Sequence, residues 1–331
     1  MRRDLVLVLA CGVAACGTPM SITDAGADAG SGADGGGVLD AGLGDAGTLA
    51  GTFTLIHTVS QFGDSSSLFG KVYDGPTPAT MVWTVDLADG DCRVEVPRVP
   101  FCATPCGGSA ACVEDNVCQA YPSAKPVGTM HVSGVRVGAD GGAVMDFDMT
   151  PVVNGYQPPA STSLSIPPFT DGAAITLTAP GSSSVVPFTL ASQGVAPMAL
   201  GASSYPIATA TALDLTWAAG SSATAARIEV EMDISHHGGI KGQILCDTAD
   251  DGSLTISAAL MTRLINLGVA GFPSVVVRRV KTGTALTNFG RVELRVTSSQ
   301  EVGLTVPGVT SCTDDPDCPM GQTCQQDLTC R

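Results

Sequence analysis

Residues 227–234 read Arg-Ile-Glu-Val-Glu-Met-Asp-Ile, a strict alternation of charged and apolar side chains. Successive side chains of a β-strand point to opposite faces of a sheet, so this stretch predicts a strand with one face in the core and the other in water. Shorter or looser versions of the pattern occur at residues 52–59, 81–87, 92–96, 145–149, 213–217 and 291–296. The sequence therefore predicts an all-β protein, an antiparallel β-sandwich that forms one large unit or two packed domains.

Changes in composition divide the rest of the chain. The β pattern extends over residues 51–310, with clusters of Gly, Pro and Ser between the strands. This region carries a cysteine-rich insert at 102–118 and is followed by a second cysteine-rich module at 311–331. The proline-rich interval 151–168 is the predicted seam if the β region divides into two domains, and we favour one continuous unit.

One short helix is predicted after residue 256. Ser257 can cap its N-terminus, Leu260, Leu264 and Leu267 share one face, and Gly268 can end it. We expect this helix to cover the edge of a sheet or the end of a barrel.

The N-terminus has the layout of a secretory signal peptide. Arg2 and Arg3 precede an apolar run over residues 5–15, which ends in small residues before Cys16. As a helix this run would be about 16 Å long, whereas a membrane span needs roughly 20 apolar residues. Residues 1–15 are therefore predicted to be a cleaved signal peptide.

Val13-Ala14-Ala15-Cys16 resembles the lipobox of bacterial lipoproteins, in which the cysteine is diacylated and becomes the new N-terminus. The resemblance implies a lipid anchor at Cys16. Gly17 stands where an aspartate would signal retention in the inner membrane, which implies the outer membrane or the cell surface. Cys11 offers a second lipobox, but the bulky Leu9 occupies a position where a small residue is usual. Plain secretion is the alternative.

Asp, Gly and Ala dominate residues 24–47, where five Asp, nine Gly and six Ala fill twenty of twenty-four positions. Such a segment cannot bury enough apolar surface to offset the entropy of ordering it, so residues 16–50 are predicted to be the anchor followed by a flexible linker. A calcium-binding repeat would need a large apolar residue in each repeat, and only Val38, Leu39 and Leu43 are present.

The chain has a net charge of −15. Proteins that bind nucleic acid need basic side chains that neutralise phosphates, so we predict no nucleic-acid partner. Anionic headgroups would repel the same surface, and contact with a membrane would therefore depend on the lipid anchor. No motif in the sequence predicts a cofactor.

Twelve cysteines are present, and subtracting Cys11 and Cys16 leaves ten, an even number in a chain predicted to be exported. Disulfides are the expected state outside the cytoplasm. Eight of the ten form two quartets of similar spacing: Cys102-x3-Cys106-x5-Cys112-x5-Cys118 and Cys312-x5-Cys318-x5-Cys324-x5-Cys330. Segments this short have no hydrophobic core of their own, so cross-links must order them.

Four cysteines allow three pairings, and the sequence does not choose among them. We expect the first cysteine to pair with the third and the second with the fourth in each quartet. Cys92 and Cys246, both on strand-like runs, remain and are paired by elimination. Zinc is the competing interpretation, but neither quartet contains two of the closely spaced cysteine pairs that structural zinc sites use, and we predict no metal.

The lipobox, the Asp-Ala-Gly linker, the quartets and the β region together resemble cysteine-rich surface lipoproteins of the myxobacterial type. The quartets, with Gly107 and Pro319 after their second cysteines, are more loosely similar to the N-terminal cysteine-rich region of Dickkopf proteins. The resemblance covers most of the chain and implies a cell-surface role without a defined biochemistry.

An enzymatic alternative rests on two short motifs. Gly63-Asp64-Ser65 resembles the nucleophile block of GDSL-type esterases, and Asp233-x-x-His236 resembles the Asp-x-x-His pair of that family. The resemblance implies a triad in which His236 takes the proton of Ser65 and Asp233 orients His236. The chain lacks the family's Gly-x-Asn-Asp block and its alternating helices, so we assign no catalytic residue.

His236-His237, with the aspartates at 247, 250 and 251, is a candidate metal site. Adjacent residues of a strand point to opposite faces, and Gly238-Gly239 favours a polar hairpin turn instead. Carbohydrate binding is a further alternative, although Trp83 and Trp217 lie on apolar strand faces that predict core positions. The sequence thus predicts a non-enzymatic, lipid-anchored surface protein that binds or contacts an unknown extracellular protein or glycan.

Overall fold

The computed structural model describes residues 46–139, 141–221 and 224–331. The predicted signal peptide, Cys16 and nearly all of the predicted linker lie outside the described residues. Strands dominate the described part, which also contains one α-helix, α1 (Ala258–Asn266), and one 3-10 turn, η1 (Asp315–Asp317). The predicted all-β class is confirmed.

An 11-stranded sheet forms the frame of the protein, with the order β12-β2-β1-β21-β20-β17-β18-β4-β3; β7 pairs with β2, and β15 pairs with β21. Its strands are β1 (Leu49–Val59), β2 (Ser65–Tyr73), β3 (Val82–Asp89), β4 (Cys92–Arg98), β7 (Ala124–Lys125), β12 (Gly155–Tyr156), β15 (Ser204–Pro206), β17 (Arg227–Asp233), β18 (Gln243–Ala249), β20 (Ser274–Thr287) and β21 (Gly290–Thr305).

Two pairings in this sheet are parallel, which the sequence pattern did not predict. β1 runs parallel to β21, with Phe53 opposite Leu294, and β15 runs parallel to the end of β21, with Tyr205 opposite Leu304. The other pairings in the sheet are antiparallel. The large sheet is therefore mixed, because β21 accepts strands from two distant parts of the chain along one edge.

Smaller sheets complete the architecture. A four-stranded sheet has the order β11-β8-β13-β14, and three strand pairs are β10-β9, β16-β19 and β5-β6. The strands are β5 (Ala110–Glu114), β6 (Val117–Ala120), β8 (Met130–Ser133), β9 (Arg136–Val137), β10 (Ala143–Val144), β11 (Phe147–Met149), β13 (Ala174–Ala179), β14 (Phe188–Gln193), β16 (Leu213–Thr216) and β19 (Ser253–Ile256).

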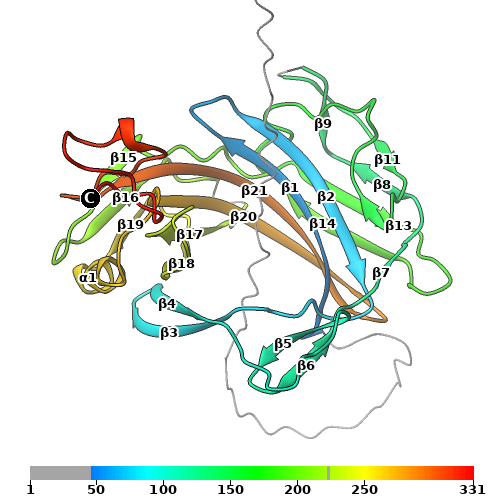
Figure 1. Cartoon of the computed structure of the whole chain (residues 1–331). Coiled ribbons are helices and arrows are strands. Elements are labelled where there is room, and N and C mark those ends of the chain that lie inside the picture. The colour runs from blue at the N-terminus through cyan, green and yellow to red at the C-terminus, as the bar shows by residue number, and fades with distance from the viewer. Residues whose placement is uncertain (1–45, 140, 222–223) are drawn as a thin grey trace, which may run out of the picture. The chain divides into compact units, whose positions relative to one another are not determined.

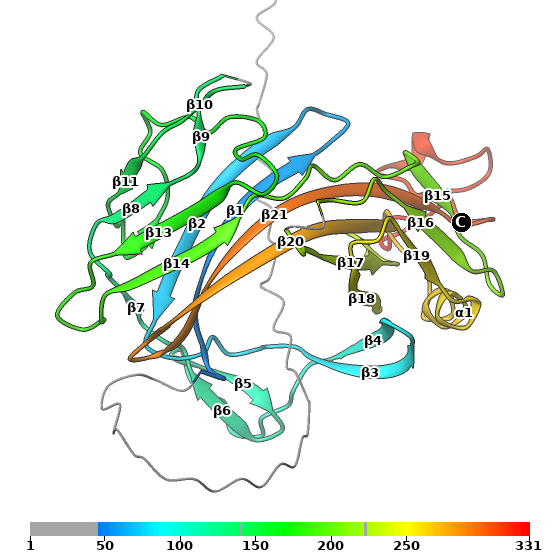
Figure 2. The ribbon, with the colours of Figure 1, turned by 180° about the vertical axis from the view of Figure 1, so that it is seen from behind.

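Two apolar cores lie against the large sheet, and the long strands β20 and β21 pass from one to the other (Figure 1; Figure 2). In the first core, β1, β2 and the beginning of β21 pack against the four-stranded sheet. In the second core, β4, β17, β18 and the end of β21 pack against β15, β16, β19 and α1. Val292, Leu294 and Val296 of β21 belong to the first core, whereas Val302 and Leu304 belong to the second.

A polar layer separates the two cores where the chain crosses from β14 to β15. Ser298 Oγ accepts the Met198 N–H at 2.8 Å, and Gln300 Oε1 accepts the Leu200 N–H at 2.7 Å. Arg279, 1% exposed, donates to the carbonyls of Ala196 and Pro197. The change of core thus falls at residues 196–200, whereas the proline-rich interval 151–168 supplies Tyr156 to the first core.

Strand β17 shows the predicted alternation with one difference. Ile228, Val230 and Met232 are fully buried, as expected, but Glu229 on the opposite face is also only 7% exposed. Arg295 of β21 reaches across β20 and donates to Glu229 Oε2 at 2.6 Å. The ion pair between β17 and β21, which lies over β20, therefore shields part of the face that was predicted to be exposed to solvent.

Helix α1 begins and ends where the sequence predicts. The Ser257 hydroxyl accepts the Leu260 N–H, and Gly268 has a φ of +103°, the conformation that ends a helix. Leu260 and Leu264 are buried in the second core, and Arg263 binds Asp86 of β3. Because β3 is the last strand of the large sheet, α1 covers a sheet edge.

Candidate functional site

Five disulfides include all ten cysteines of the described residues: Cys92–Cys246, Cys102–Cys112, Cys106–Cys118, Cys312–Cys324 and Cys318–Cys330. In both quartets the first cysteine pairs with the third and the second with the fourth, as expected. Cys92 and Cys246 lie opposite each other on β4 and β18 and join these strands inside the second core. Since the sulfurs of both quartets are bonded to one another, they are not thiolate ligands for a metal.

The two cysteine modules also share a backbone conformation that was not predicted. An aspartate stands three residues after the third cysteine of each, Asp115 and Asp327, and the next residue, Asn116 or Leu328, has a φ near +60°. Each aspartate accepts a hydrogen bond from an arginine: Arg98 Nη1 lies 2.7 Å from Asp115 and Arg331 Nη2 lies 2.8 Å from Asp327. The aspartate at equal spacing is the sequence signal that could have predicted this common turn.

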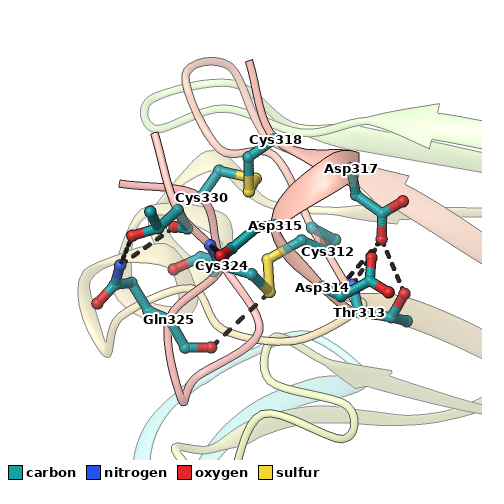
Figure 3. The surroundings of a disulfide bond; sticks show 12 residues. Cys312, Thr313, Asp314, Asp315, Asp317, Cys318, Cys324, Gln325 and Cys330 are labelled. Atoms are coloured by element: carbon teal, nitrogen blue, oxygen red, sulfur yellow. Dashed lines mark hydrogen bonds between the residues drawn. A yellow bond between two sulfur atoms is a disulfide. The ribbon is translucent and has the colours of Figure 1, made fainter. Parts of the chain in front are cut away.

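Acidic side chains order the C-terminal module from within. Figure 3 shows Asp317 beside Thr313, whose N–H and hydroxyl each donate to Asp317 Oδ2 at 2.8 Å. These bonds, led by the Thr313 N–H, lower the pKa of the Asp317 carboxyl. Asp315 Oδ1 accepts the Cys324 N–H at 2.9 Å. Both carboxylates serve as acceptors that fix turns around the disulfides.

The C-terminal module docks tightly against the body of the protein. The Gly271 N–H donates to Asp327 O at 2.7 Å, and the Ser311 hydroxyl donates to Gly271 O at 2.5 Å. A Cβ on Gly238 would lie 2.3 Å from Gly271 N and 2.7 Å from Asp327 O, so the close approach requires glycine there. The module is therefore held by direct backbone contacts.

A groove of about 310 Å³ lies where the module meets the body, lined by Val269, Pro273, Leu304, Thr305, Val306, Val309, Thr310 and Ser311. A smaller cavity of about 90 Å³ adjoins it through Val269 and Val309 and extends to Thr329, Cys330 and Arg331. The lining comes from the segment before β20, the end of β21 with the residues that follow it, and the C-terminal module. This groove was not predicted, because its lining residues form no local sequence motif.

The proposed esterase residues do not meet. His236 Nδ1 lies 3.7 Å from Asp233 Oδ2, but Ser65 lies opposite Thr58, on β2. Four strand spacings separate β2 from β17 along the order β2-β1-β21-β20-β17, which is about 19 Å at ~4.8 Å per spacing. The predicted triad is therefore not assembled.

The other sequence candidates lie in a turn and on two strands or the residues next to them. His236 and His237 lie in a turn closed by the bond from the Gly238 N–H to Ser235 O, as the glycines predicted. Trp217 is 7% exposed in the second core and donates its indole N–H to Asp250. Trp83 is half-buried on β3. The tryptophan in the core cannot serve as an exposed platform for a sugar.

A buried histidine is the titratable group that the sequence reasoning missed. His57 of β1 places Nδ1 3.2 Å from Ser298 Oγ, and its Nε2 lies 3.4 Å from Asp64 Oδ2, too far for a strong hydrogen bond. Burial lowers the pKa of His57, and Asp64 opposes this effect. Ser298 is fully buried, so this constellation has no hydroxyl that a substrate could reach.

His57 is expected to reduce stability at acidic pH. Because its pKa lies below the ordinary value of 6.5 in the folded state, the unfolded chain binds more protons as the pH falls through 6.5, and the free energy of unfolding decreases. Urea unfolding at pH 7.5 and 5.5 should show a smaller decrease for His57→Gln than for the wild type.

His131 is the matched control for that experiment. Asp148 and Asp146 raise the pKa of His131, so its protonation favours the folded state as the pH falls. His131→Gln should therefore show a larger loss of stability between pH 7.5 and 5.5 than the wild type. If the free energy of unfolding of His57→Gln fell between pH 7.5 and 5.5 by as much as that of the wild type, His57 would not be the cause of the acid destabilisation.

These features define an all-β protein whose described residues contain five disulfides, which indicates an oxidising compartment outside the cytoplasm. Within the described ranges no helix is both long enough and apolar enough to span a bilayer. A scan against protein-family models and a search of curated proteins each found no match to this chain.

Proposed function

We propose that this protein is a non-enzymatic, lipid-anchored surface protein that displays a disulfide-stapled β body for contact with an extracellular protein or glycan. The observation that carries the proposal is that every cysteine of the described residues is in a disulfide, in a chain whose first residues have the layout of a lipoprotein signal. Disulfides fit an exported protein, and a lipobox fits one that stays attached.

The described part of the chain enters the body at one end of the hairpin β20-β21, and the C-terminal module follows the other end. Thr48 O accepts the Arg291 N–H at 2.8 Å, next to the turn between β20 and β21. At the opposite end of this hairpin Ser274 pairs with Gly303, and the chain continues into the C-terminal module. β20 has 14 residues, so the hairpin is about 45 Å long when measured along this strand at ~3.3 Å per residue.

Acyl labelling tests the anchor. Wild-type protein expressed in a bacterial host with labelled palmitate should carry the label, and Cys16→Ala should lose it entirely because the acceptor thiol is gone. Cys11→Ala is the matched control and should remain labelled. Equal labelling of wild type and Cys16→Ala would rule out the anchor.

A further inference from the structure

The first cysteine module, residues 102–118 with their flanks, exposes apolar side chains at positions that are covered in the C-terminal module. Phe101 and Val117, which directly precede its first and fourth cysteines, are 71% and 45% exposed. The equivalent residues of the C-terminal module are Ser311 and Thr329, which form a β-bridge. Ser311 bonds to Gly271 of the body, and Thr329 is only 3% exposed. The larger apolar residues thus stand in the module that is open to water, the reverse of the usual preference.

These exposed side chains lie on one face of the first module. Val99 and Phe101 are exposed and Pro100 between them is buried, so the two exposed side chains point to the same side of the segment. The Asn116 N–H donates to Phe101 O at 3.0 Å, which places Val117 next to this segment. Val99, Phe101 and Val117 are called the apolar face below. Contiguous apolar surface of this kind is typical of a contact site.

The apolar face lies near the end of the large sheet at which the described chain begins. The start of β1 lies beside the end of β2, where Gly51 pairs with Val72. Just after β2, Pro76 O accepts a hydrogen bond from the Gln119 side chain of β6 at 2.9 Å. Val117 is two residues, or about 7 Å, from Gln119 along β6. The first module is therefore held at the end of the sheet from which the chain leads back to Cys16.

We propose that the apolar face contacts the lipid bilayer, with Phe101 at the boundary between headgroups and acyl chains. This inference rests on the proposed attachment at Cys16. A Gly-rich coil of about 30 residues, the length of chain between Cys16 and residue 46, spans ~30 Å, so an anchored body stays close to the membrane. Three side chains are far fewer than the roughly 20–30 residues per side of a standard protein interface. A contact this small suffices for a bilayer, because the tether raises its effective concentration.

Fluorescence quenching by brominated lipid tests the proposal. The chain from Cys16 onward, with its disulfides formed, is coupled through the Cys16 thiol to a maleimide lipid in phosphatidylcholine vesicles, because the net charge of −15 disfavours anionic lipids. This chemical tether makes the outcome independent of whether a cell acylates Cys16. Phe101→Trp should lose about half or more of its added fluorescence when the acyl chains carry bromine near the headgroups, since interfacial side chains lie about 5–10 Å deep.

Phe62→Trp is the matched control. Phe62 is 91% exposed in the turn between β1 and β2, at the opposite end of that hairpin. Brominated and ordinary lipid should leave Phe62→Trp equally bright, and the signal of Trp83 and Trp217 is subtracted with the wild type. Equal quenching of Phe62→Trp and Phe101→Trp would overturn the proposal, because the body would then have no preferred face toward the membrane.

A second set of variants uses the internal repeat. Phe101→Ser with Val117→Thr gives the first module the residues of the C-terminal module, and both positions are exposed, so the thermal midpoint should stay unchanged. Val99→Trp should be quenched in the otherwise unchanged chain and should lose about half or more of this quenching in the double variant, since less apolar area can be buried. Undiminished quenching of Val99→Trp in the double variant would reject the apolar face. Absence of quenching at Phe101→Trp would also reject the bilayer and leave a protein partner for the face.

Discussion

Asp250→Ala is expected to lower the free energy of unfolding by about 3–5 kcal/mol, the range for removing one partner of a buried ion pair. Asp250 binds Arg279, whose Nε lies 2.6 Å from Oδ2 and whose Nη2 lies 3.0 Å from Oδ1. It also accepts the Trp217 indole N–H and the Gly220 N–H. Without this carboxylate a fully buried guanidinium remains uncompensated, at the layer where the two cores meet.

Asp247→Ala is the matched control, because Asp247 forms an ion pair with Arg227 on the exposed surface. That change should cost no more than about 1 kcal/mol. Urea unfolding of both variants measures the difference. The double variant Arg279→Met with Asp250→Ala should recover part of the loss, since the buried charge is gone. A loss at Asp250 no larger than at Asp247 would show that the polar layer does not stabilise the fold.

Removing the Cys92–Cys246 disulfide, with both cysteines changed to alanine, is expected to cost about 5 kcal/mol. The bond closes a loop with a sequence separation of 154, and the cost of freeing a loop in the unfolded chain grows with its length. Denaturant unfolding should show a lower midpoint for the whole β body, since the two cysteines join β4 and β18 in the second core.

The Cys318–Cys330 disulfide provides the comparison. Its sequence separation is 12, for which the same chain-entropy argument gives about 3 kcal/mol. The module has no core of its own, so its loss should appear as local proteolysis near residues 311–331 while the β body keeps its midpoint. If loss of Cys318–Cys330 lowered the unfolding midpoint of the β body as much as loss of Cys92–Cys246, the module and the body would unfold as one cooperative unit.

Local patterns predicted much of the fold correctly. The alternation in residues 227–234 predicted a strand, and Ser257 and Gly268 predicted the ends of α1. The parallel pairing of β1 with β21 could not be predicted in this way, because the partners lie far apart in the chain and neither carries a local signal for the other. The burial of Glu229 depends on the registers of β17 with β20 and of β20 with β21, which bring Arg295 within reach.

Of the candidate site, only the disulfides were predicted from the sequence. Cysteine spacing and parity led to the disulfides, but the groove and the cavity beside it combine Val269, Val306 and Arg331 from three separate segments. His57 and Ser298 are 241 residues apart, so their contact also follows from strand register alone. The resemblance of Gly63-Asp64-Ser65 to an esterase motif predicted a contact between Ser65 and His236. In the structure Asp64 lies beside His57 instead, and His236 lies beside Asp233.

Intact mass spectrometry of the protein from a membrane fraction tests the central claim most directly. The account predicts a chain that begins at an acylated Cys16 and lacks two hydrogens for each of the five disulfides. A chain that retains Met1, carries no lipid and has free thiols would contradict it.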